Sequence, residues 1–413
     1  MTYREAEAWL LDLELFGMRF GLDRMHKLVT ALGMPQRRFA AIHVVGSNGK
    51  SSTARFCAGI LSRHGVSTGC YTSPHLRSFA ERIEVDGAPI GDEEFAAAAA
   101  RVRRSVELVE RTLGTEDRVT QFEALTAVAY QALAARGVDA AVVEAGLGGR
   151  YDATSVIASK VQVLTGVSLE HTKWLGPTIG QIAAEKLAVV PRGGRLVTGP
   201  LDPEAEEAAE RVAGEQGARR IRVPGDAPVP PLRAAGSFQR LNFALARAAA
   251  EAFLERPLDE GAVRRAAAEV EVAGRLQVVG ERPLVLHDGA HNPAGARALA
   301  GTLPEVLAGR PLTAVIAVLD DKDAAGVLAA LLPACERAVL TRCSNPRSLP
   351  PATLASLAEQ VSPGARVETV TEPRAAVERA MALAGPEGAV LATGSIYLIA
   401  DLVRDAEARA SAL

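Results

Sequence analysis

The chain has 413 residues, 48% of them hydrophobic and 23% charged, with a formal net charge of -3 at pH 7 and a pI near 6.2. This length exceeds one typical core and indicates two domains, while the charge balance argues against nucleic acid or an anionic membrane as a partner. Because no apolar run reaches the roughly 18 residues of a spanning helix and residues 1–7 carry acids early, we expect a cytoplasmic protein with reduced cysteines.

The chain is expected to begin with two helices. Ala6, Leu10, Leu13 and Phe16 recur at helical spacing, a glycine-bounded break follows at residues 17–21, and a second helix runs to about Gly33. These helices precede the stretch that carries the strongest chemical signal.

Residues 39–53 predict a strand, a glycine loop and a helix. An apolar run ends at Val45, the turn Gly46-Ser-Asn-Gly49 follows, and a helical pattern starts at Lys50. Backbone N–H groups, the helix dipole and the lysine charge together favour an anion of phosphate size. Ser51 or Ser52 can supply a hydroxyl to phosphate or Mg²⁺. The spacing differs from the common G-x-x-x-x-G-K-[ST] loop, and a plain glycine turn with a surface lysine is the alternative.

Strands and helices alternate through the rest of the first domain. Strands are expected at residues 66–72, 138–144 and 161–167, and helices at 96–113, 122–135 and 178–190. Further units run to about Val223, four prolines make residues 224–231 a rigid connector, and helices at 237–254 and 259–272 close the domain.

Three side chains at the ends of these strands are candidate Mg²⁺ ligands. Ser73 and Glu144 end strands, and His171 follows another. A carboxylate after the apolar residues 140–143 is costly to bury without a cation, although a cap on the adjacent glycine loop would also explain Glu144. His171 is equally consistent with an ordinary hydrogen-bonding histidine, because Mg²⁺ prefers oxygen.

Lys186 lies in the expected helix at residues 178–190. Spacing alone favours a surface lysine paired with an acid, and the alternative is a desolvated, reactive amine. Only six of the 46 basic residues are lysines, which favours a chemical role for Lys50 and Lys186.

A second α/β domain is expected after a hinge at residues 274–275. Strands are predicted at residues 283–287, 312–319, 337–343, 366–370 and 388–393, most of them followed by a helical pattern. Such alternation predicts a parallel sheet with ligands at the carboxyl ends of the strands. Polar residues at 287–293, 320–323 and 394–395 are therefore candidates for one rim that lines a site.

The ordered set of motifs resembles the folylpolyglutamate synthase/dihydrofolate synthase family, relatives of the Mur ligases, over nearly the whole chain. The matching segments are FGMRFGLDR at 16–24, HVVGSNGKSS at 43–52, TSPHL at 72–76, ERI at 81–83, FEALT at 122–126, EAGLGGRYDAT at 144–154, EH at 170–171, EK at 185–186, GR at 274–275, DGAHNP at 288–293, DKD at 321–323 and GSIY at 394–397. The family usually has glycine where this chain has Ser51, and aspartate where it has Glu170.

The resemblance implies an α/β fold in two parts and an ATP-dependent amide ligase. Residues 1–274 would form a P-loop-containing, Mur-ligase-like ATPase domain, and residues 275–413 a smaller Rossmann-like glutamate ligase domain. In this family ATP phosphorylates a pterin-bearing carboxylate, and the amine of L-glutamate attacks the acyl phosphate. The implied substrates are dihydropteroate or reduced folates, and the implied state is a monomer.

The resemblance also implies roles for individual residues. Lys50, Lys186 and His291 would act in catalysis, with Lys186 carried as a carbamate and a monovalent cation as a further cofactor. ATP would contact Asn48, Gly49, Lys50, Ser51, Ser52, Asn242, Arg275 and Asp288. Mg²⁺ would bind Ser73, Glu144 and His171, and glutamate would bind His291 and Ser395.

Other functions remain open on the sequence. A Mur-type cell-wall amino-acid ligase would use the same ATP and Mg²⁺ site, although the segments at 72–76 and 144–154 favour the folate branch. A P-loop regulator would not need the motifs of the second domain. A catalytically inactive binding protein would be expected to lack Lys50, Glu144 or Lys186, and all three are present.

Overall fold

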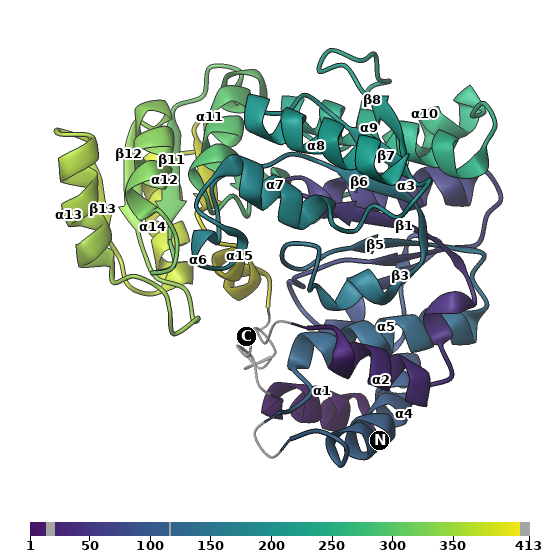
Figure 1. The fold of residues 1–413 in the computed structure, drawn as a ribbon. Coiled ribbons are helices and arrows are strands. Elements are labelled where there is room, and N and C mark those ends of the chain that lie inside the picture. Colours follow the sequence, from purple (N-terminus) through teal and green to yellow (C-terminus); the bar gives the residue numbers. More distant parts are fainter. Residues whose placement is uncertain (14–20, 115–116, 405–413) are drawn as a thin grey trace. The chain divides into compact units, whose positions relative to one another are not determined.

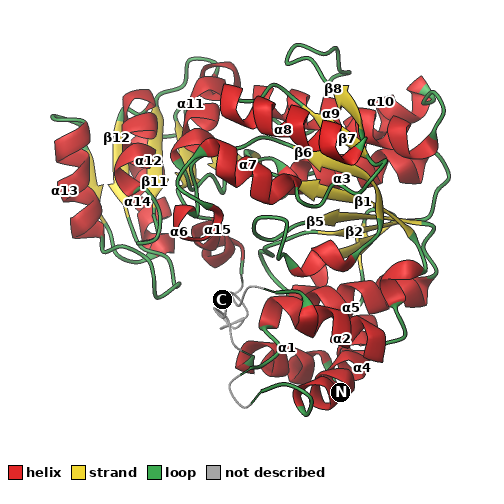
Figure 2. Ribbon diagram, in the orientation of Figure 1, coloured by secondary structure: helices red, strands yellow, loops and turns green. Residues whose placement is uncertain are grey.

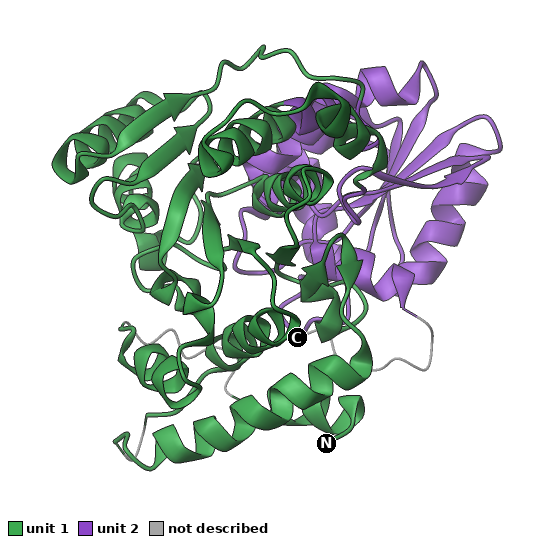
Figure 3. Cartoon of the chain, turned by 90° about the vertical axis from the view of Figure 1, so that its right-hand side faces the viewer, with its two compact units in different colours: residues 1–231, 241–270, 413 green, residues 232–240, 271–412 purple. Residues whose placement is uncertain are grey.

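The computed structural model describes residues 1–13, 21–114 and 117–404. The chain divides into two compact units, coloured separately in Figure 3. Of the described residues, unit 1 contains 1–231 and 241–270, and unit 2 contains 232–240 and 271–404. Phe16 and most of the predicted break at residues 17–21 lie outside the described residues.

Unit 1 is built on an eight-stranded sheet with the order β4-β3-β2-β5-β1-β6-β7-β8 (Figure 2). Its strands are β1 (Ala40–Val45), β2 (Thr68–Tyr71), β3 (Ile83–Val85), β4 (Ala88–Pro89), β5 (Ala140–Glu144), β6 (Ser159–Leu164), β7 (Arg195–Thr198) and β8 (Arg219–Arg222). The six strands from β2 to β8 in this order are parallel, whereas β3 and β4 extend the β2 edge in antiparallel pairing. The predicted parallel sheet is confirmed.

The helices of unit 1 are α1 (Tyr3–Asp12), α2 (Asp23–Ala31), α3 (Lys50–Arg63), α4 (Asp92–Glu110), α5 (Gln121–Arg136), α6 (Thr172–Leu175), α7 (Ile179–Leu187), α8 (Pro203–Gln216), α9 (Ser237–Leu254, which begins in unit 2) and α10 (Glu260–Glu269). One core joins α1, α2, α4 and α5 to the β1–β2–β5 part of the sheet, and these helices lie together in Figure 1. A second core joins α7 and α8 to β6 and β7.

Local signals explain where α5 begins and ends. Thr120 and Glu123 form a reciprocal capping box at its start, and Gly137 ends it in a left-handed conformation with φ of 67°. Glu123 also receives hydrogen bonds from the buried Arg24 guanidinium at 3.1 and 3.2 Å, which ties α2 to the first turn of α5. The Arg24 and Glu123 charges compensate each other, so both side chains can be buried.

Unit 2 is built on a six-stranded sheet with the order β13-β12-β11-β14-β10-β9. Its strands are β9 (Gln277–Glu281), β10 (Leu284–His287), β11 (Leu312–Ile316), β12 (Arg337–Leu340), β13 (Val367–Thr369) and β14 (Ala389–Thr393), and its helices are α11 (Pro293–Leu307), α12 (Ala324–Leu331), α13 (Pro351–Val361), α14 (Pro373–Ala384) and α15 (Ile396–Val403). All five predicted strands are present and parallel to one another, as expected.

The expected element ends differ from the observed ones where loops begin. The strand predicted at 161–167 ends at Leu164, because the next residues form a loop beside residues 46–49, the predicted phosphate loop. Ser47 N–H of the phosphate loop donates to Gly166 O at 2.9 Å. The strand predicted at 312–319 ends at Ile316, and the antiparallel edge strand β9 was not predicted. β9 is mostly exposed and lacks the apolar run that marks a buried strand.

Candidate functional site

The loop between β1 and α3 is shaped by two glycines. Gly46 and Gly49 have φ values of 150° and 82°. A Cβ atom at Gly46 would overlap the hydroxyl of Thr165, which itself donates to Asn48 O at 2.6 Å. The loop therefore requires glycine at both positions and is fixed from outside by the end of β6.

Lys50 begins α3, and its amine turns back over the loop. Its Nζ donates to Gly46 O at 3.0 Å and to Ser47 O at 3.4 Å. Ser51 and Ser52 follow in the first turn of the same helix, where backbone N–H groups lack intrahelical partners. The local arrangement combines a full positive charge, a helix amino terminus and hydroxyls, which is the set that binds phosphate.

Asn242 lies against this loop, although almost 200 residues separate it from Gly49 in the sequence. A Cβ atom at Gly49 would overlap the side-chain oxygen of Asn242 from α9. Both residues belong to unit 1. The structure thus brings Asn242 beside the phosphate loop.

Glu144 joins the loop to the end of β2. Its side chain is buried, with 2% exposed, and accepts hydrogen bonds from Ser51 Oγ at 2.9 Å and from Ser73 N–H at 3.0 Å. Register pairs Glu144 with Val44, just before the loop. Carboxylate and hydroxyl oxygens at one point form a donor set that fits Mg²⁺. Ser51, the residue that replaces the glycine usual in the resembling family, contributes directly to this set.

Lys186 is buried rather than on the surface, so the interpretation that spacing alone favours is wrong. Its side chain is 1% exposed, and its Nζ donates to Gly46 O at 3.0 Å and to Glu170 at 3.3 Å. Burial lowers the pKa of Lys186 to about 8, although the Glu170 carboxylate acts in the opposite direction. α7 therefore places a buried amine with a lowered pKa against the phosphate loop.

His171 is the residue next to Glu170 and precedes α6. It occupies a left-handed backbone conformation with φ of 48°, which is uncommon for a side chain with Cβ. Burial would raise the pKa of Glu170, but the charges of Lys186 and Lys50, with smaller contributions from Ser47 and His171, lower it to about 2. The structure therefore places His171 beside the Lys186–Glu170 pair.

The second glycine loop, at residues 146–152, is held by residues that the sequence analysis did not single out. Asp152 is buried and accepts from Leu147 N–H at 2.8 Å and Thr154 N–H at 3.0 Å. The Thr154 hydroxyl lies 2.8 Å from Nε2 of His43 on β1. Asp152, Thr154 and His43 stand inside the motifs at 43–52 and 144–154, which was the signal available in the sequence.

In unit 2, Asp288 organises the chain around Arg275. The Asp288 carboxylate is buried and accepts from Leu276 N–H at 2.8 Å and Ala290 N–H at 2.7 Å. Burial raises the pKa of Asp288, and the Arg275 charge opposes this effect. A Cβ atom at Gly289 would lie 2.5 Å from the Arg275 guanidinium, so these predicted residues are neighbours.

The two residues expected to meet glutamate also lie at strand ends of unit 2. His291 Nδ1 is 2.9 Å from Gly289 O in the loop after β10, and the buried Ser395 caps α15 by accepting from Tyr397 N–H at 3.2 Å. β10 and β14 are adjacent parallel strands, so both residues follow the same edge of the sheet.

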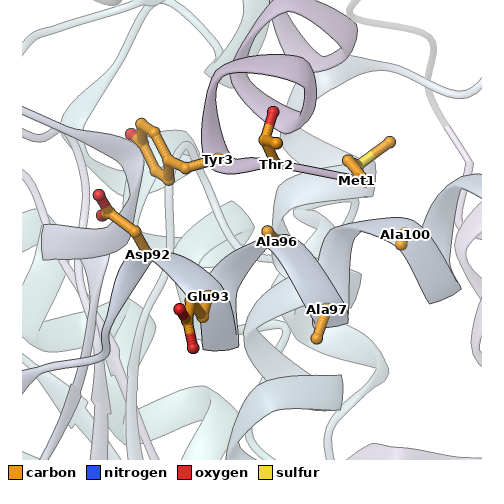
Figure 4. A pocket seen from close by; sticks show the side chains of 8 residues that line it. All are labelled: Met1, Thr2, Tyr3, Asp92, Glu93, Ala96, Ala97 and Ala100. Atoms are coloured by element: carbon orange, nitrogen blue, oxygen red, sulfur yellow. The ribbon is translucent and has the colours of Figure 1, made fainter.

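A separate hollow of about 460 Å³ lies between the start of α1 and α4 (Figure 4). Met1, Thr2 and Tyr3 line one side, and Asp92, Glu93 and three alanines of α4 line the other. None of the predicted site residues lines it.

Among the described helices, none is both long and apolar enough to cross a membrane.

Comparisons with known proteins give consistent results. A family model described as the Mur ligase, glutamate ligase domain, matches residues 274–396. The dihydrofolate synthase/folylpolyglutamate synthase of Mycobacterium tuberculosis is 37% identical over 402 residues, covering 88% of this chain and 82% of the relative.

Solved structures resemble the whole chain. The folylpolyglutamate synthase of Mycobacterium tuberculosis complexed with ADP superposes with a TM-score of 0.91 at 34% identity, covering 97% of each chain. The bifunctional folylpolyglutamate synthase/dihydrofolate synthase of Yersinia pestis complexed with AMPPNP and Mn ion gives 0.84 at 28% identity, again over 97% of each chain.

Proposed function

The chain belongs to the dihydrofolate synthase/folylpolyglutamate synthase family of ATP-dependent glutamate ligases in the Mur ligase superfamily, and from this premise we propose the reaction that its site performs. A pterin-bearing carboxylate, from dihydropteroate or a reduced folate, attacks the γ-phosphorus of ATP and releases ADP. The amine of L-glutamate then attacks the acyl phosphate and expels phosphate, which leaves an amide. A Mur-type cell-wall substrate is not favoured.

One observation carries the proposal: Lys50, Ser51, Glu144 and Ser73 converge at the carboxyl ends of three neighbouring strands. The loop amides and Lys50 would hold the ATP phosphates and offset the negative charge that develops on the transferred group. Asn48, Gly49 and Ser52 would complete the ATP contacts of the loop. Asn242 would also contact the nucleotide, a role that its position beside Gly49 supports.

Related structures contain a nucleotide and a divalent metal. The Mycobacterium tuberculosis enzyme is complexed with ADP, and the Yersinia pestis enzyme with AMPPNP and Mn ion. We assign the Mg²⁺ ligands to Ser73, Glu144 and His171. When bound, the metal supplies charge neutralisation between phosphate oxygens. Ser51 would help to hold the Glu144 carboxylate in place through its 2.9 Å hydrogen bond.

The residues of unit 2 receive complementary roles in this proposal. Arg275 and Asp288 would contact ATP, and His291 and Ser395 would bind the incoming glutamate. We divide the chain functionally into an ATP-binding domain at residues 1–274 and a glutamate ligase domain at 275–413. The match of the glutamate ligase family model to residues 274–396 supports this division.

We further propose that Lys186 is carbamylated. Its neutral amine would add to CO₂, forming an N–C bond and releasing one proton, and would replace a cation by an anion near the metal. The lowered pKa of the buried amine supports this reaction, because only the neutral amine is nucleophilic. Incorporation of ¹³CO₂, observed by carbon NMR and absent in Lys186→Arg, is the expected result.

The remaining proposals concern the surroundings of the enzyme. We propose that it acts as a monomer in the cytoplasm and that a monovalent cation stimulates it. Light scattering of the purified protein would give the monomer mass, and turnover in K⁺ would exceed turnover in a salt of a bulky organic cation.

The central experiment measures ATP-dependent incorporation of labelled L-glutamate with dihydropteroate or tetrahydrofolate as acceptor. Lys50→Ala should abolish incorporation, whereas Lys160→Ala, a change at an exposed lysine of the same unit, should leave it unchanged. Turnover with dihydropteroate alone would identify a dihydrofolate synthase, and turnover with both acceptors a bifunctional enzyme. No Lys50-dependent amide formation with either acceptor would refute the proposed function.

A further inference from the structure

A buried chain of hydrogen bonds connects β1 to the second glycine loop of unit 1. The Thr154 hydroxyl donates its only proton to the Asp152 carboxylate. The same oxygen lies 2.8 Å from His43 Nε2 and must therefore accept a proton from that nitrogen. Nε2 of the imidazole is therefore protonated.

His43 has no access to solvent that would supply another partner for this nitrogen. Its side chain is 1% exposed, and burial lowers its pKa to about 4, which agrees with the neutral form. Thr154 is fully buried, and its carbonyl is held by Tyr130 OH at 2.9 Å. Tyr130 thus holds the backbone of Thr154, and His43 and Asp152 hold its hydroxyl on either side.

At the Asp152 end, the chain of hydrogen bonds also holds the second glycine loop, at residues 146–152. The second carboxylate oxygen of Asp152 accepts from Leu147 N–H at 2.8 Å, three residues after Glu144. Asp152 N–H donates to Gly149 O at 3.1 Å. The position of the carboxylate therefore determines the path of the loop that leaves Glu144.

The same loop packs on the helix that carries Lys186. Arg150 N–H donates to Glu185 O at 3.1 Å, and a Cβ atom at Gly149 would lie 2.5 Å from Lys186 O. One end of the loop is thus continuous with Glu144 and its middle contacts the backbone at Lys186. A shift of the loop would move both.

We propose that His43 is a positioning residue, which holds the 146–152 loop through Thr154 and Asp152 and thereby sets the geometry of Glu144 and Lys186. The expected effect of His43 on turnover rests on the proposed function. The expected effect of His43 on the 146–152 loop does not depend on that function. The imidazole touches neither substrate nor metal in this scheme. It acts through a hydroxyl and a carboxylate that lie in the same core.

Hydrogen exchange tests the structural part without any assay of activity. His43→Leu removes the donor and Thr154→Val removes the hydroxyl, so both should accelerate amide exchange in residues 146–154. His43→Gln, whose amide nitrogen reaches about as far as Nε2, should restore protection. Thr68→Val is the matched control, because Thr68 is also buried and its hydroxyl bonds within its own segment, to Val66 O at 2.7 Å. Equal exchange in all variants would overturn the proposal.

Steady-state kinetics test the catalytic part. His43→Leu and Thr154→Val should each lower kcat on the order of 10-fold or more and raise the Mg²⁺ concentration for half-maximal rate, with the KM for ATP little changed. The double variant should be no worse than either single one, because both break one chain. A uniform loss without rescue by Gln would mean that His43 is merely structural. Absence of ligation by the unaltered enzyme would refute the proposed function but leave the exchange result intact.

Discussion

At the scale of single residues, the site contains charged groups that burial makes costly. Glu144 is buried at the end of an apolar strand and accepts hydrogen bonds from two neutral donors, the Ser51 hydroxyl and the Ser73 amide. Groups of this kind are retained for function at the expense of stability. Two predictions follow from the burial of individual side chains.

Replacing Glu144 by Gln should separate activity from stability. The amide oxygen can still accept from Ser73 N–H while the Ser51 hydroxyl turns to accept from the amide nitrogen, so both of these hydrogen bonds can be kept. We expect turnover to fall roughly 100-fold or more because the metal loses a carboxylate ligand, with the melting temperature unchanged or higher. Calorimetry and the glutamate assay measure the two quantities. A large drop in melting temperature would show that Glu144 is chiefly structural.

The buried His43 should make stability depend on pH. Its pKa is about 4 in the folded protein against the ordinary 6.5, because burial disfavours the charged imidazole. The unfolded chain therefore binds more protons between these values, and stability falls as pH decreases from about 6.5 to 4. The group contributes at most about 3 kcal/mol to this fall.

The measurement compares urea unfolding of the natural protein with His43→Gln across the same pH range. His287 has a similarly lowered pKa and stays in both proteins, so the difference between them isolates His43. We expect a smaller pH dependence in the variant. Parallel curves would contradict the assignment of a neutral buried imidazole.

At the scale of elements, the strand, loop and helix at β1–α3 depend on glycines for two different reasons. Gly49 and Gly65 have nearly equal φ values, 82° and 80°. The two ends of α3 differ in their surroundings: Asn242 blocks a Cβ atom at Gly49, whereas nothing lies within 4 Å of one at Gly65. Substitutions at Gly49 and Gly65 therefore separate the energetic cost of backbone strain from that of steric overlap.

Gly65→Ala should cost roughly 1–2 kcal/mol through backbone strain alone. Gly49→Ala should cost more and should also weaken ATP binding, because Asn242 must move away from the loop. Denaturant unfolding and calorimetric titration with ATP check both effects. Equal stability losses and equal ATP affinity in the two variants would show that Asn242 does not support the loop.

At the scale of the whole molecule, two units with separate sheets and cores predict separable responses to ligand. Mg-ATP at 100 times its Kd should stabilise the unit that binds it by about 2.7 kcal/mol. Because the phosphate loop and Asn242 both belong to unit 1, we expect the calorimetric transition of that unit to move to higher temperature by more than that of unit 2, where Arg275 and Asp288 would contact ATP. Lys50→Ala should abolish the shift. A shift that persists in Lys50→Ala would place nucleotide binding elsewhere.

Local patterns in the amino-acid sequence were enough to predict the alternation of strands and helices, the glycine loop at residues 46–49 and the family. Apolar periodicity, glycine turns and motif order can all be seen along the chain without coordinates. The sequence predicted the carboxylate at the end of β5 for the same reason: an acid after four apolar residues is visible without coordinates. It did not reveal β9, whose exposed edge carries no apolar run.

Contacts between residues far apart in the sequence became visible only in the folded protein. The burial of Lys186 depends on α7 packing beside the phosphate loop, and spacing alone favoured the opposite interpretation. The contact of Asn242 with Gly49 and the path from His43 through Thr154 to Asp152 join segments roughly 100 to 200 residues apart. Burial and long-range hydrogen bonds arise when elements pack, so a one-dimensional pattern contains no direct record of them.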